Sequence, residues 1–380
     1  MSKEANIFVL IDALGWEWIK NTSFLREVAP YRARLESVLG YSTAAIPSIL
    51  TGQYPQEHGR VALFRRAIGK SPFRPVEWIC KLPPSLVENS YTRYAVKEFT
   101  RRINHFGGWF HLLGVPLRLL PMLDVSEKLN IYEPRGIPEV PSIFDLLKDR
   151  NVDYGVYTYH DGPNDELIAR IGRDLRISEK SFFLLYLDGL DGFLHQHADK
   201  AGAVAERLKF YSDALTSVYE VAERNYGTVR MHVFGDHGMA PTNAVIDVQT
   251  RLARLNLKVP DDYFCLLDST MARFTFFNDK ARERIMSQVF SPADGGHWLE
   301  DQELRSLRSW FDDRRYGDAI YLMPEGTIIV GNSPGEIVSR GMHGFHPTAA
   351  HSASAYVSSE EPGNQLGHIT QVFSLMAACI

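Results

Sequence analysis

The sequence predicts an α/β fold in which helices cover both faces of a mostly parallel sheet. Short apolar runs typical of strands alternate with longer stretches whose apolar residues recur at helical spacing. Such alternation is the pattern of parallel strands joined by crossover helices. The expected strands are residues 6–11, 153–159, 182–187, 228–234 and 355–358. The expected helices are residues 44–50, 142–149, 165–171 and 202–226.

The individual elements rest on local patterns. The first strand is an apolar run that stops at Asp12, and a small-residue turn at residues 40–45 leads into the first helix. The helix at residues 202–226 has the clearest pattern, because six of its apolar residues recur at near-helical spacing. These residues are Ala203, Leu208, Tyr211, Leu215, Val218 and Val221.

Two stretches interrupt the alternation and are expected as insertions. Residues 60–140 are rich in aromatic residues and proline, and residues 252–335 have the pattern of a small α/β subdomain. The subdomain has an expected helix at 302–310 and expected strands at 272–277, 319–322 and 327–330. The core is then expected to consist of residues 1–59, 141–251 and 336–380.

Composition narrows the class of protein. Of 380 residues, 45% are hydrophobic and 23% charged, which is ordinary for a soluble globular protein. A net charge of −5 and a pI near 6.2 argue against bulk nucleic-acid binding. Three scattered cysteines indicate neither a disulfide framework nor a thiolate metal site. We see no secretion signal or membrane-spanning segment, so we expect a cytoplasmic protein.

Six side chains with metal-binding chemistry occur beside the expected strands and turns. They are Asp12, Asp191, His195, Asp236, His237 and His343. Ligands in parallel sheets bind beyond the carboxyl ends of the strands, where the aspartates occur. Taken singly, Asp12 is equally typical of a helix cap and His343 of a turn residue. Together, hard oxygen and imidazole ligands in this number predict a two-metal phosphoester site.

The small-residue turn supplies the candidate nucleophile. Ser42 and Thr43 both precede the first expected helix. A hydroxyl becomes a nucleophile when a metal lowers its pKa, and a helix N-terminus favours the charge of a phosphate. Either residue also suits plain helix capping, which is compatible with catalysis.

These residues together resemble the alkaline phosphatase superfamily, most closely its nucleotide pyrophosphatase/phosphodiesterase-like branch. The most specific matching segments are residues 50–59 and 235–239, followed by Met342-His343-Gly344-Phe345. The resemblance implies a three-layer α/β/α core and two divalent metal ions, zinc with manganese as the alternative. It assigns one metal to Asp191, His195 and His343. It assigns the other to Asp12, Asp236 and His237, with Ser42 also bridging toward it.

The resemblance also implies the catalytic roles. Counting back from the Thr51-Gly52 pair places the nucleophile at Ser42, with Thr43 as the runner-up. The phosphodiesterase branch has a phosphate-binding Asn where this chain has Leu63. Arg60, Arg65 and Arg66 are the candidates for binding the phosphate in place of that Asn.

The leading interpretation is a hydrolase of phosphodiester or pyrophosphate bonds that forms a phosphoseryl intermediate. Its expected substrate is a small phosphoester, either nucleotide-linked or lipid-linked. A phosphomonoesterase or a metal-dependent phosphomutase uses the same metals. A non-catalytic scaffold that kept the fold is the alternative from another class, and it has no need of six ligands and a hydroxyl together.

The first insertion adds an expectation about partners. Residues 60–122 carry eleven Lys or Arg against three Glu, a net charge of +8. Residues 106–123 are strongly apolar but broken by Gly and Pro, which is typical of a lid or an interfacial segment. We expect them to cover an amphiphilic anionic substrate or to contact an anionic membrane peripherally. A solvated basic face over an ordinary core explains the charge equally well.

Overall fold

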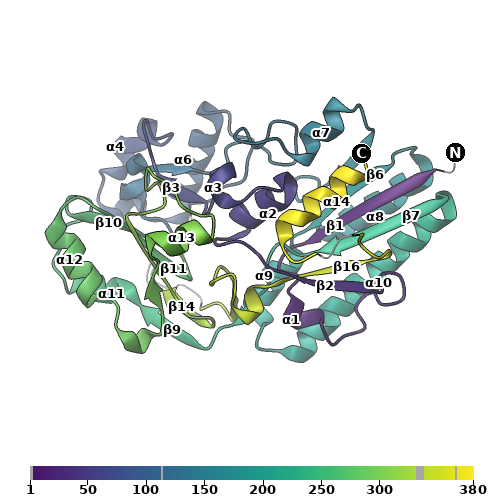
Figure 1. The fold of residues 1–380 in the computed structure, drawn as a ribbon. Coiled ribbons are helices and arrows are strands. Elements are labelled where there is room, and N and C mark those ends of the chain that lie inside the picture. The colour runs from purple at the N-terminus through teal and green to yellow at the C-terminus, as the bar shows by residue number, and fades with distance from the viewer. Residues whose placement is uncertain (1–2, 113, 331–337, 364–365) are drawn as a thin grey trace. The chain divides into compact units, whose positions relative to one another are not determined.

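The computed structural model describes residues 3–112, 114–330, 338–363 and 366–380. The chain folds into two compact units, drawn in Figure 1. The first unit comprises Met1–His58, Tyr132–Thr242 and Ser339–Ile380, and the second comprises Gly59–Ile131 and Asn243–Val338. The boundary expected between residues 335 and 336, like Leu113 of the expected lid, lies outside the described residues.

A six-stranded sheet forms the centre of the first unit, in the order β2-β16-β7-β1-β6-β5. Four neighbouring strands, β7, β1, β6 and β5, are parallel, whereas β16 runs antiparallel to both β7 and β2. The sheet is therefore mostly parallel, as predicted. The bounds are β1 (Glu4–Ile11), β2 (Tyr31–Leu35), β5 (Tyr154–Tyr157), β6 (Phe182–Leu187), β7 (Thr228–Phe234) and β16 (Ser354–Ser358).

Helices cover both faces of this sheet, which confirms the three-layer α/β/α core. Alternate residues of β1, such as Ile7 and Val9, enter a fully buried cluster with α8 (Asn164–Ile177), α9 (Gly189–His197) and α10 (Ala201–Asn225). The layer on the other side contains α2 (Ser42–Thr51), α7 (Ile143–Asp149) and α14 (Val372–Ala378). Figure 1 shows α2 and α14 on one side of the sheet and α10 on the other.

The expected elements of the core coincide with observed ones, with small shifts at their ends. Helices α2 and α8 are longer than expected, and β5 is shorter. Strand β2 was not expected, because its sequence, Tyr-Arg-Ala-Arg-Leu, has no apolar run. It lies at the edge of the sheet, where polar side chains remain accessible to solvent. Among the other short elements of this unit are α1 (Trp16–Ile19), α3 (Pro55–His58), η4 (Ala350–Ser352) and η5 (Ile369–Gln371).

A buried histidine lies within the sheet, away from the predicted metal ligands. His232 of β7 stacks on Phe8 with ring centroids 4.8 Å apart, and its Nδ1 lies 2.7 Å from the Tyr356 hydroxyl. Burial, with a smaller effect of Arg230, lowers the pKa of His232 to about 4. The imidazole is therefore neutral in the folded protein under ordinary conditions.

This environment predicts an acid-dependent loss of stability. Unfolded, the imidazole has a pKa of about 6.5, so below that pH the unfolded chain binds a proton that the folded chain excludes. We expect the free energy of unfolding to fall by about 2 kcal/mol between pH 7.5 and pH 5 because of His232. Urea unfolding of wild type and His232→Gln at several pH values measures this loss. Parallel losses in the two proteins would show that other groups cause it.

The second unit combines both inserted stretches. Its four-stranded antiparallel sheet has the order β10-β11-β13-β12, and two further strand pairs are β3–β4 and β9–β14. The strands are β3 (Phe64–Arg66), β4 (Leu123–Val125), β9 (Ala244–Asp247), β10 (Tyr263–Leu267), β11 (Met271–Phe276), β12 (His297–Trp298), β13 (Ala319–Leu322) and β14 (Thr327–Val330).

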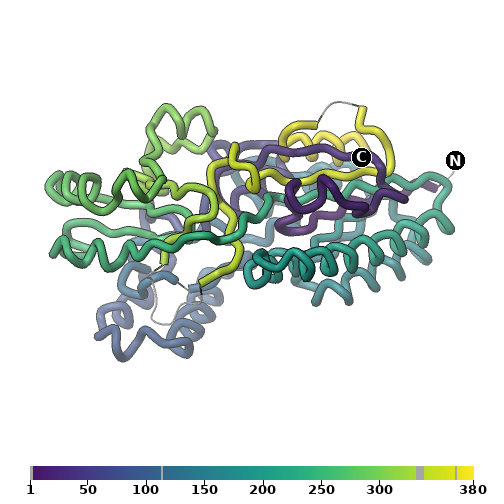
Figure 2. The backbone as a smooth tube through the Cα atoms, turned by 90° about the horizontal axis from the view of Figure 1, so that it is seen from below, coloured from purple at the N-terminus to yellow at the C-terminus, as the bar shows by residue number. Residues whose placement is uncertain are grey.

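Two groups of helices complete this unit. The first group is η1 (Arg74–Val76), α4 (Glu77–Cys80), α5 (Pro84–Val87), α6 (Ser90–Ile103) and η2 (Leu117–Met122). The second group is α11 (Val248–Ala253), α12 (Asp279–Gln288), η3 (Pro292–Asp294) and α13 (Asp301–Ser306). Within the unit, the blue segment with α4–α6 and the green segment with α11–α13 lie on different sides (Figure 2). Across the described residues, no helix is both long and apolar enough to cross a membrane.

Most apolar side chains of residues 106–123 are buried, which argues against the membrane contact expected through this segment. Its apolar side chains Phe110, Leu112, Leu117 and Leu120 are at most 3% exposed. They join one hydrophobic core with residues of the other inserted stretch, including Phe264. Gly and Pro break the helical pattern because the chain turns back here, which directs these side chains inward. Deleting this segment would therefore remove part of the core of the second unit.

Candidate functional site

The predicted metal ligands come together at one edge of the first unit's sheet. Strands β1 and β7 are adjacent and parallel, with Leu10 opposite Phe234, so both end at the same edge. Asp12 follows β1 directly, and Asp236 follows β7 after a single glycine. Both carboxylates are buried. This arrangement follows from parallel pairing, which aligns the carboxyl ends of the strands.

One group of ligands is centred on Asp191. Asp191 and His195 are one helical turn apart in α9, with Asp191 Oδ2 3.3 Å from His195 Nε2. His343 follows β15 (Gly341–Met342), which pairs with β8 (Ala240–Pro241). Its Nε2 lies 3.6 Å from Asp191 Oδ1. One ligand atom from each of Asp191, His195 and His343 lies within 4.8 Å of the others, a spacing that suits a single metal ion.

A second group surrounds His237. Its Nε2 lies 3.4 Å from Asp12 Oδ1 and 3.2 Å from Asp236 Oδ2. Ligand atoms of Asp12, Asp191 and His237 also lie within 4.8 Å of one another. Asp191 thus takes part in both groups, although the resemblance assigns it to one metal only. The two groups are adjacent parts of one centre.

The unpaired oxygens of this centre fit a divalent cation. Asp12 Oδ1, Asp191 Oδ1 and Asp236 Oδ2 are buried and have no hydrogen-bond partner among the described residues. Each lies 3.2–3.6 Å from an imidazole Nε2. Two ligands of a tetrahedral ion with bonds of about 2.0–2.2 Å are about 3.3–3.6 Å apart. The separations are therefore those of atoms that share an ion, and such oxygens are costly to bury without one.

Backbone carbonyls orient two of the imidazoles. His195 Nδ1 lies 2.8 Å from the carbonyl oxygen of Gly341, and His237 Nδ1 lies 2.9 Å from that of Gly238. An Nδ1–H that donates to a carbonyl leaves Nε2 with the lone pair, which is the arrangement of metal-binding histidines. Both rings are thus prepared to bind an ion through Nε2.

Two glycines allow the loop after β7 to pack tightly. A Cβ on Gly235 would lie 2.4 Å from the carbonyl oxygen of Leu14, and one on Gly238 would lie 2.2 Å from that of His351. Real side chains do not tolerate such distances. The sequence Gly-Asp-His-Gly therefore places Asp236 and His237 by close backbone packing.

Electrostatics within the centre also fits cation binding. Burial, followed by the charges of Asp236 and Asp191, raises the pKa of Asp12 well above its usual range. Burial opposes ionisation of Asp191 too, but the hydrogen bond from His195 lowers its pKa overall. Burial and the neighbouring His237, whose ring stacks 3.8 Å away, lower the pKa of His343 well below its usual value. A neutral His343 keeps a lone pair for a metal.

The two candidate nucleophiles have different surroundings. Ser42 is the first residue of α2, and its Oγ lies 3.0 Å from His237 Nε2. The Thr43 hydroxyl is buried, and no described residue forms a hydrogen bond with it. Only Ser42 therefore contacts a predicted metal ligand directly, and it does so at a helix N-terminus, which favours a bound phosphate.

The arginines predicted to hold phosphate belong to the second unit. Arg65 pairs with Asp124 at 3.1 Å, and Arg66 donates to the carbonyl oxygen of Asp313 at 2.7 Å. Arg60 is 2% exposed in the same unit. Burial raises the pKa of the nearby Glu127, and after the opposing effect of the Arg60 charge this pKa is about 7. The guanidinium groups of Arg65 and Arg66 thus already have partners within their own unit.

Sequence reasoning missed one functional candidate, Tyr186. It lies on β6 beside Leu10 of β1, and its hydroxyl donates a hydrogen bond to Asp12 Oδ2. Its pKa is raised well above the usual value by burial and by the Asp12 charge, so it remains a donor. The sequence feature that could have identified Tyr186 is its hydroxyl group, which lies in an otherwise apolar strand five residues before Asp191.

Tyr186→Phe is expected to weaken divalent-metal binding by about 10–100-fold, because the variant leaves Asp12 without the donor that orients it. Competition with a chromophoric chelator measures this affinity directly. Tyr157→Phe is a matched control, since it removes a buried hydroxyl that donates to Asp174 at 2.6 Å. Equal metal affinities in all three proteins would contradict a positioning role for Tyr186.

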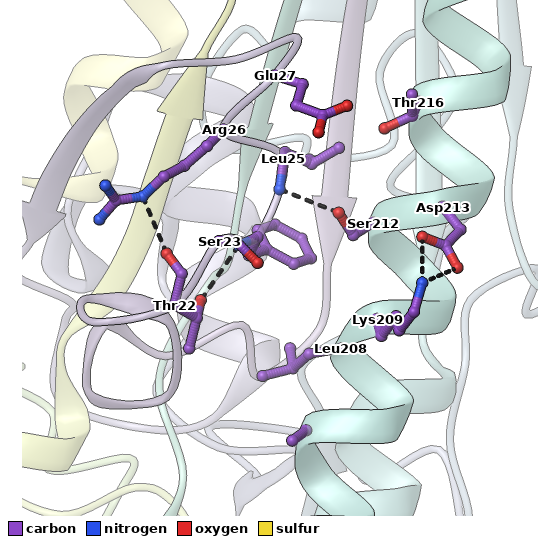
Figure 3. A pocket seen from close by; sticks show the side chains of 12 residues that line it. Thr22, Ser23, Leu25, Arg26, Glu27, Leu208, Lys209, Ser212, Asp213 and Thr216 are labelled. Atoms are coloured by element: carbon purple, nitrogen blue, oxygen red, sulfur yellow. Dashed lines mark hydrogen bonds and ion pairs between the residues drawn. The ribbon is translucent and has the colours of Figure 1, made fainter.

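A separate cavity of the first unit contains none of these residues. Its volume is about 710 Å³, and it lies between the loop after α1 and helix α10. Figure 3 shows Leu25 N–H directed at Ser212 Oγ, 3.0 Å away, and Lys209 paired with Asp213. The lining residues are Thr22, Ser23, Phe24, Leu25, Arg26, Glu27, Ala205, Leu208, Lys209, Ser212, Asp213 and Thr216. The cavity therefore has no part in the metal centre.

Comparison with known proteins identifies the family of this chain. The family model for type I phosphodiesterase/nucleotide pyrophosphatase matches residues 6–346. The comparison with curated proteins gives no match.

Solved structures share the fold. Human ectonucleotide pyrophosphatase/phosphodiesterase 5 gives a TM-score of 0.69 at 12% identity, covering 99% of this chain and 94% of that one. The murine protein gives 0.68 at 14%, covering 99% and 94%. An inactive threonine-to-alanine variant of the murine protein, in complex with AMP, gives 0.67 at 14%, covering 99% and 95%. At these identities the likeness concerns the fold.

Proposed function

The chain belongs to the type I phosphodiesterase/nucleotide pyrophosphatase family, within the alkaline phosphatase superfamily, and from this premise we propose a two-metal mechanism for it. Family membership makes it a phosphodiesterase-like hydrolase. The observation that carries the proposal is the set of three buried carboxylate oxygens without hydrogen bonds, each beside an imidazole Nε2. That donor set suits zinc, with manganese as the alternative.

We assign the ligands of the two ions as follows. Asp191, His195 and His343 hold one ion, and Asp12, Asp236 and His237 hold the other. The proximity of Asp191 to the second group supports two ions close together. When bound, such a pair supplies charge stabilisation to the attacking and leaving oxygens and increases the acidity of a bound hydroxyl or water.

Ser42 is the nucleophile in this proposal. Its Oγ, 3.0 Å from His237 Nε2, forms a bond to phosphorus as the bond to the leaving oxygen breaks, and the hydroxyl proton passes through water to the leaving oxygen. Backbone N–H groups at the start of α2 stabilise the phosphoryl oxygens. Water then cleaves the bond between Oγ and phosphorus, which releases a phosphate monoester and restores Ser42. The buried strand ends hold these groups in a fixed geometry throughout.

The proposed substrate is a small phosphodiester or pyrophosphate with a nucleotide part. The structural neighbour in complex with AMP supports this class. A lipid-linked phosphodiester has the same reacting group and differs only in its other substituent.

The test compares three p-nitrophenyl esters on the zinc-loaded protein. They are p-nitrophenyl phosphate, bis-p-nitrophenyl phosphate and the p-nitrophenyl ester of thymidine 5′-monophosphate. We expect kcat/KM to be highest for the nucleotide diester and lowest for the monoester. A preference for the monoester would instead establish a phosphatase or mutase. Absence of hydrolysis from all three, with two zinc ions bound, would refute the proposed activity.

A further inference from the structure

Exposed apolar side chains are concentrated in one part of the second unit. Among the described residues, sixteen large hydrophobic side chains are exposed, and nine of them occur within residues 68–109. The nine are Ile68, Trp78, Leu82, Leu86, Tyr91, Tyr94, Phe99, Ile103 and Trp109. This stretch is about a ninth of the chain, so scattered exposure does not explain the concentration. We call these nine residues the apolar patch.

The apolar patch lies on a folded framework. Helix α6 directs Val96 and Thr100 into the unit, while Tyr91 and Tyr94 on its outer side are 87% and 67% exposed. The same stretch of chain contributes buried residues such as Phe73 to the core of the unit. Six of the nine exposed residues lie on helices α4, α5 and α6, so folded helices carry most of the patch.

Positive charge accompanies the apolar patch. Residues 68–109 contain seven Lys or Arg residues and three Glu. Each Glu already has a basic partner: Glu77 pairs with Lys81, Glu88 with Arg93, and Glu98 with Lys97 and Arg101. Within the described part of the chain, the exposed Lys70 and Arg102 form no ion pair. The surface consequently keeps a net positive charge.

We propose that the apolar patch, with Lys70 and Arg102, binds the surface of an anionic lipid bilayer. Exposed Trp and Tyr suit the boundary between headgroups and acyl chains, and nearby Lys and Arg are attracted to anionic headgroups. A positive surface excludes basic partners and selects an anionic one.

This inference replaces the membrane contact expected at residues 106–123, where only Trp109 belongs to the patch. It concerns binding alone and holds whether or not the proposed hydrolysis is correct. If both hold, the enzyme acts at a lipid surface, where lipid-linked phosphodiesters are available.

Vesicle co-sedimentation of the full chain tests the proposal. We expect at least about tenfold tighter binding to vesicles with 30% phosphatidylserine in phosphatidylcholine than to phosphatidylcholine alone, and weaker binding at high salt. Trp78→Ser/Tyr91→Ser/Tyr94→Ser removes apolar contacts, and Lys70→Glu/Arg102→Glu reverses two charges. Each is expected to lower binding about tenfold or more, because each removes one of the two attractions.

Matched substitutions on the first unit serve as controls. Ile177 is 81% exposed, and Arg173 and Arg176 are exposed on the same helix, α8. Ile177→Ser and Arg173→Glu/Arg176→Glu are expected to bind vesicles as wild type does. Thermal melting shows whether each variant is folded.

Two results would overturn the inference. One is equal binding of wild type and both patch variants to the anionic vesicles, including no binding by any of them. The other is a vesicle-free dimer in sedimentation velocity that Trp78→Ser/Tyr91→Ser/Tyr94→Ser abolishes, which would assign the patch to self-association.

Discussion

Replacing Ser42 by alanine is expected to lower kcat on a phosphodiester by about 1000-fold or more with little change in metal content. The substitution removes the attacking oxygen and leaves all six predicted ligands in place. Ser42 is only partly buried at the start of α2, so the helix and the sheet edge should persist. Steady-state rates together with metal analysis of the purified variant measure both parts of this expectation.

Thr43→Ala is the matched comparison for Ser42→Ala. It removes the neighbouring hydroxyl, which is buried and contacts no predicted ligand, so we expect a much smaller loss of activity. Rapid acid quenching of the reaction with the nucleotide diester, followed by peptide mass analysis, should find the nucleoside phosphoryl group on residue 42. If Thr43→Ala causes the larger loss and this group is found on residue 43, Thr43 is the nucleophile.

Asp236→Asn is expected to stabilise the metal-free protein while weakening metal binding. Asp236 is fully buried, and its charge contributes to the raised pKa of Asp12. Without a cation, buried carboxylates repel each other, and an amide relieves that repulsion. The amide oxygen can still accept the hydrogen bond from Ala13 N–H, which is 3.1 Å long in the wild type. Asn is therefore a sharper test than Ala.

We expect Tm of metal-free Asp236→Asn to exceed that of metal-free wild type by about 1–2 °C, which corresponds to about 1 kcal/mol for a chain of this length. The rise in Tm on adding zinc should be much smaller in this variant than in the wild type. The reason is that weaker zinc binding to the folded protein gives less stabilisation. Activity should fall by about 100-fold or more. Differential scanning fluorimetry with and without zinc, followed by rate measurements, provides these values.

Asp268→Asn is the control for Asp236→Asn, because Asp268 forms an ion pair with the buried Arg273 of the second unit. It is expected to lower Tm and to leave the zinc-induced rise unchanged. If Asp236→Asn behaves in the same way, Asp236 is a structural residue and the ligand assignment for the second ion fails.

Local sequence was sufficient for the framework of the first unit. The apolar runs before Asp12 and Asp236 form adjacent parallel strands, and the helical spacing at residues 202–226 corresponds to α10. These predictions succeed because the spacing of apolar residues is a property of a short segment. Parallel pairing then brings the two aspartates to one edge without further information.

Contacts between segments that are distant in sequence could not be predicted from local patterns. His343 reaches Asp191 only through the pairing of β15 with β8, and Tyr186 meets Asp12 only through the register of β6 on β1. The apolar residues 106–123 illustrate the same limit, because an apolar run has one composition whether it lies on the surface or in a core. Here Phe264, far away in sequence, shares a core with them.

Arg65 and Arg66 show that the partner of a charged residue cannot be predicted from the net charge of its segment. A count of Lys and Arg describes the total charge of a segment, but Asp124 and Asp313 are the partners that engage Arg65 and Arg66. The hydrophobic period of each segment is encoded locally, and it places Asp12 and Asp236 at the ends of strands. Burial, pairing and the partner of each charge depend on which segments pack together, because those quantities arise from contacts across the whole chain.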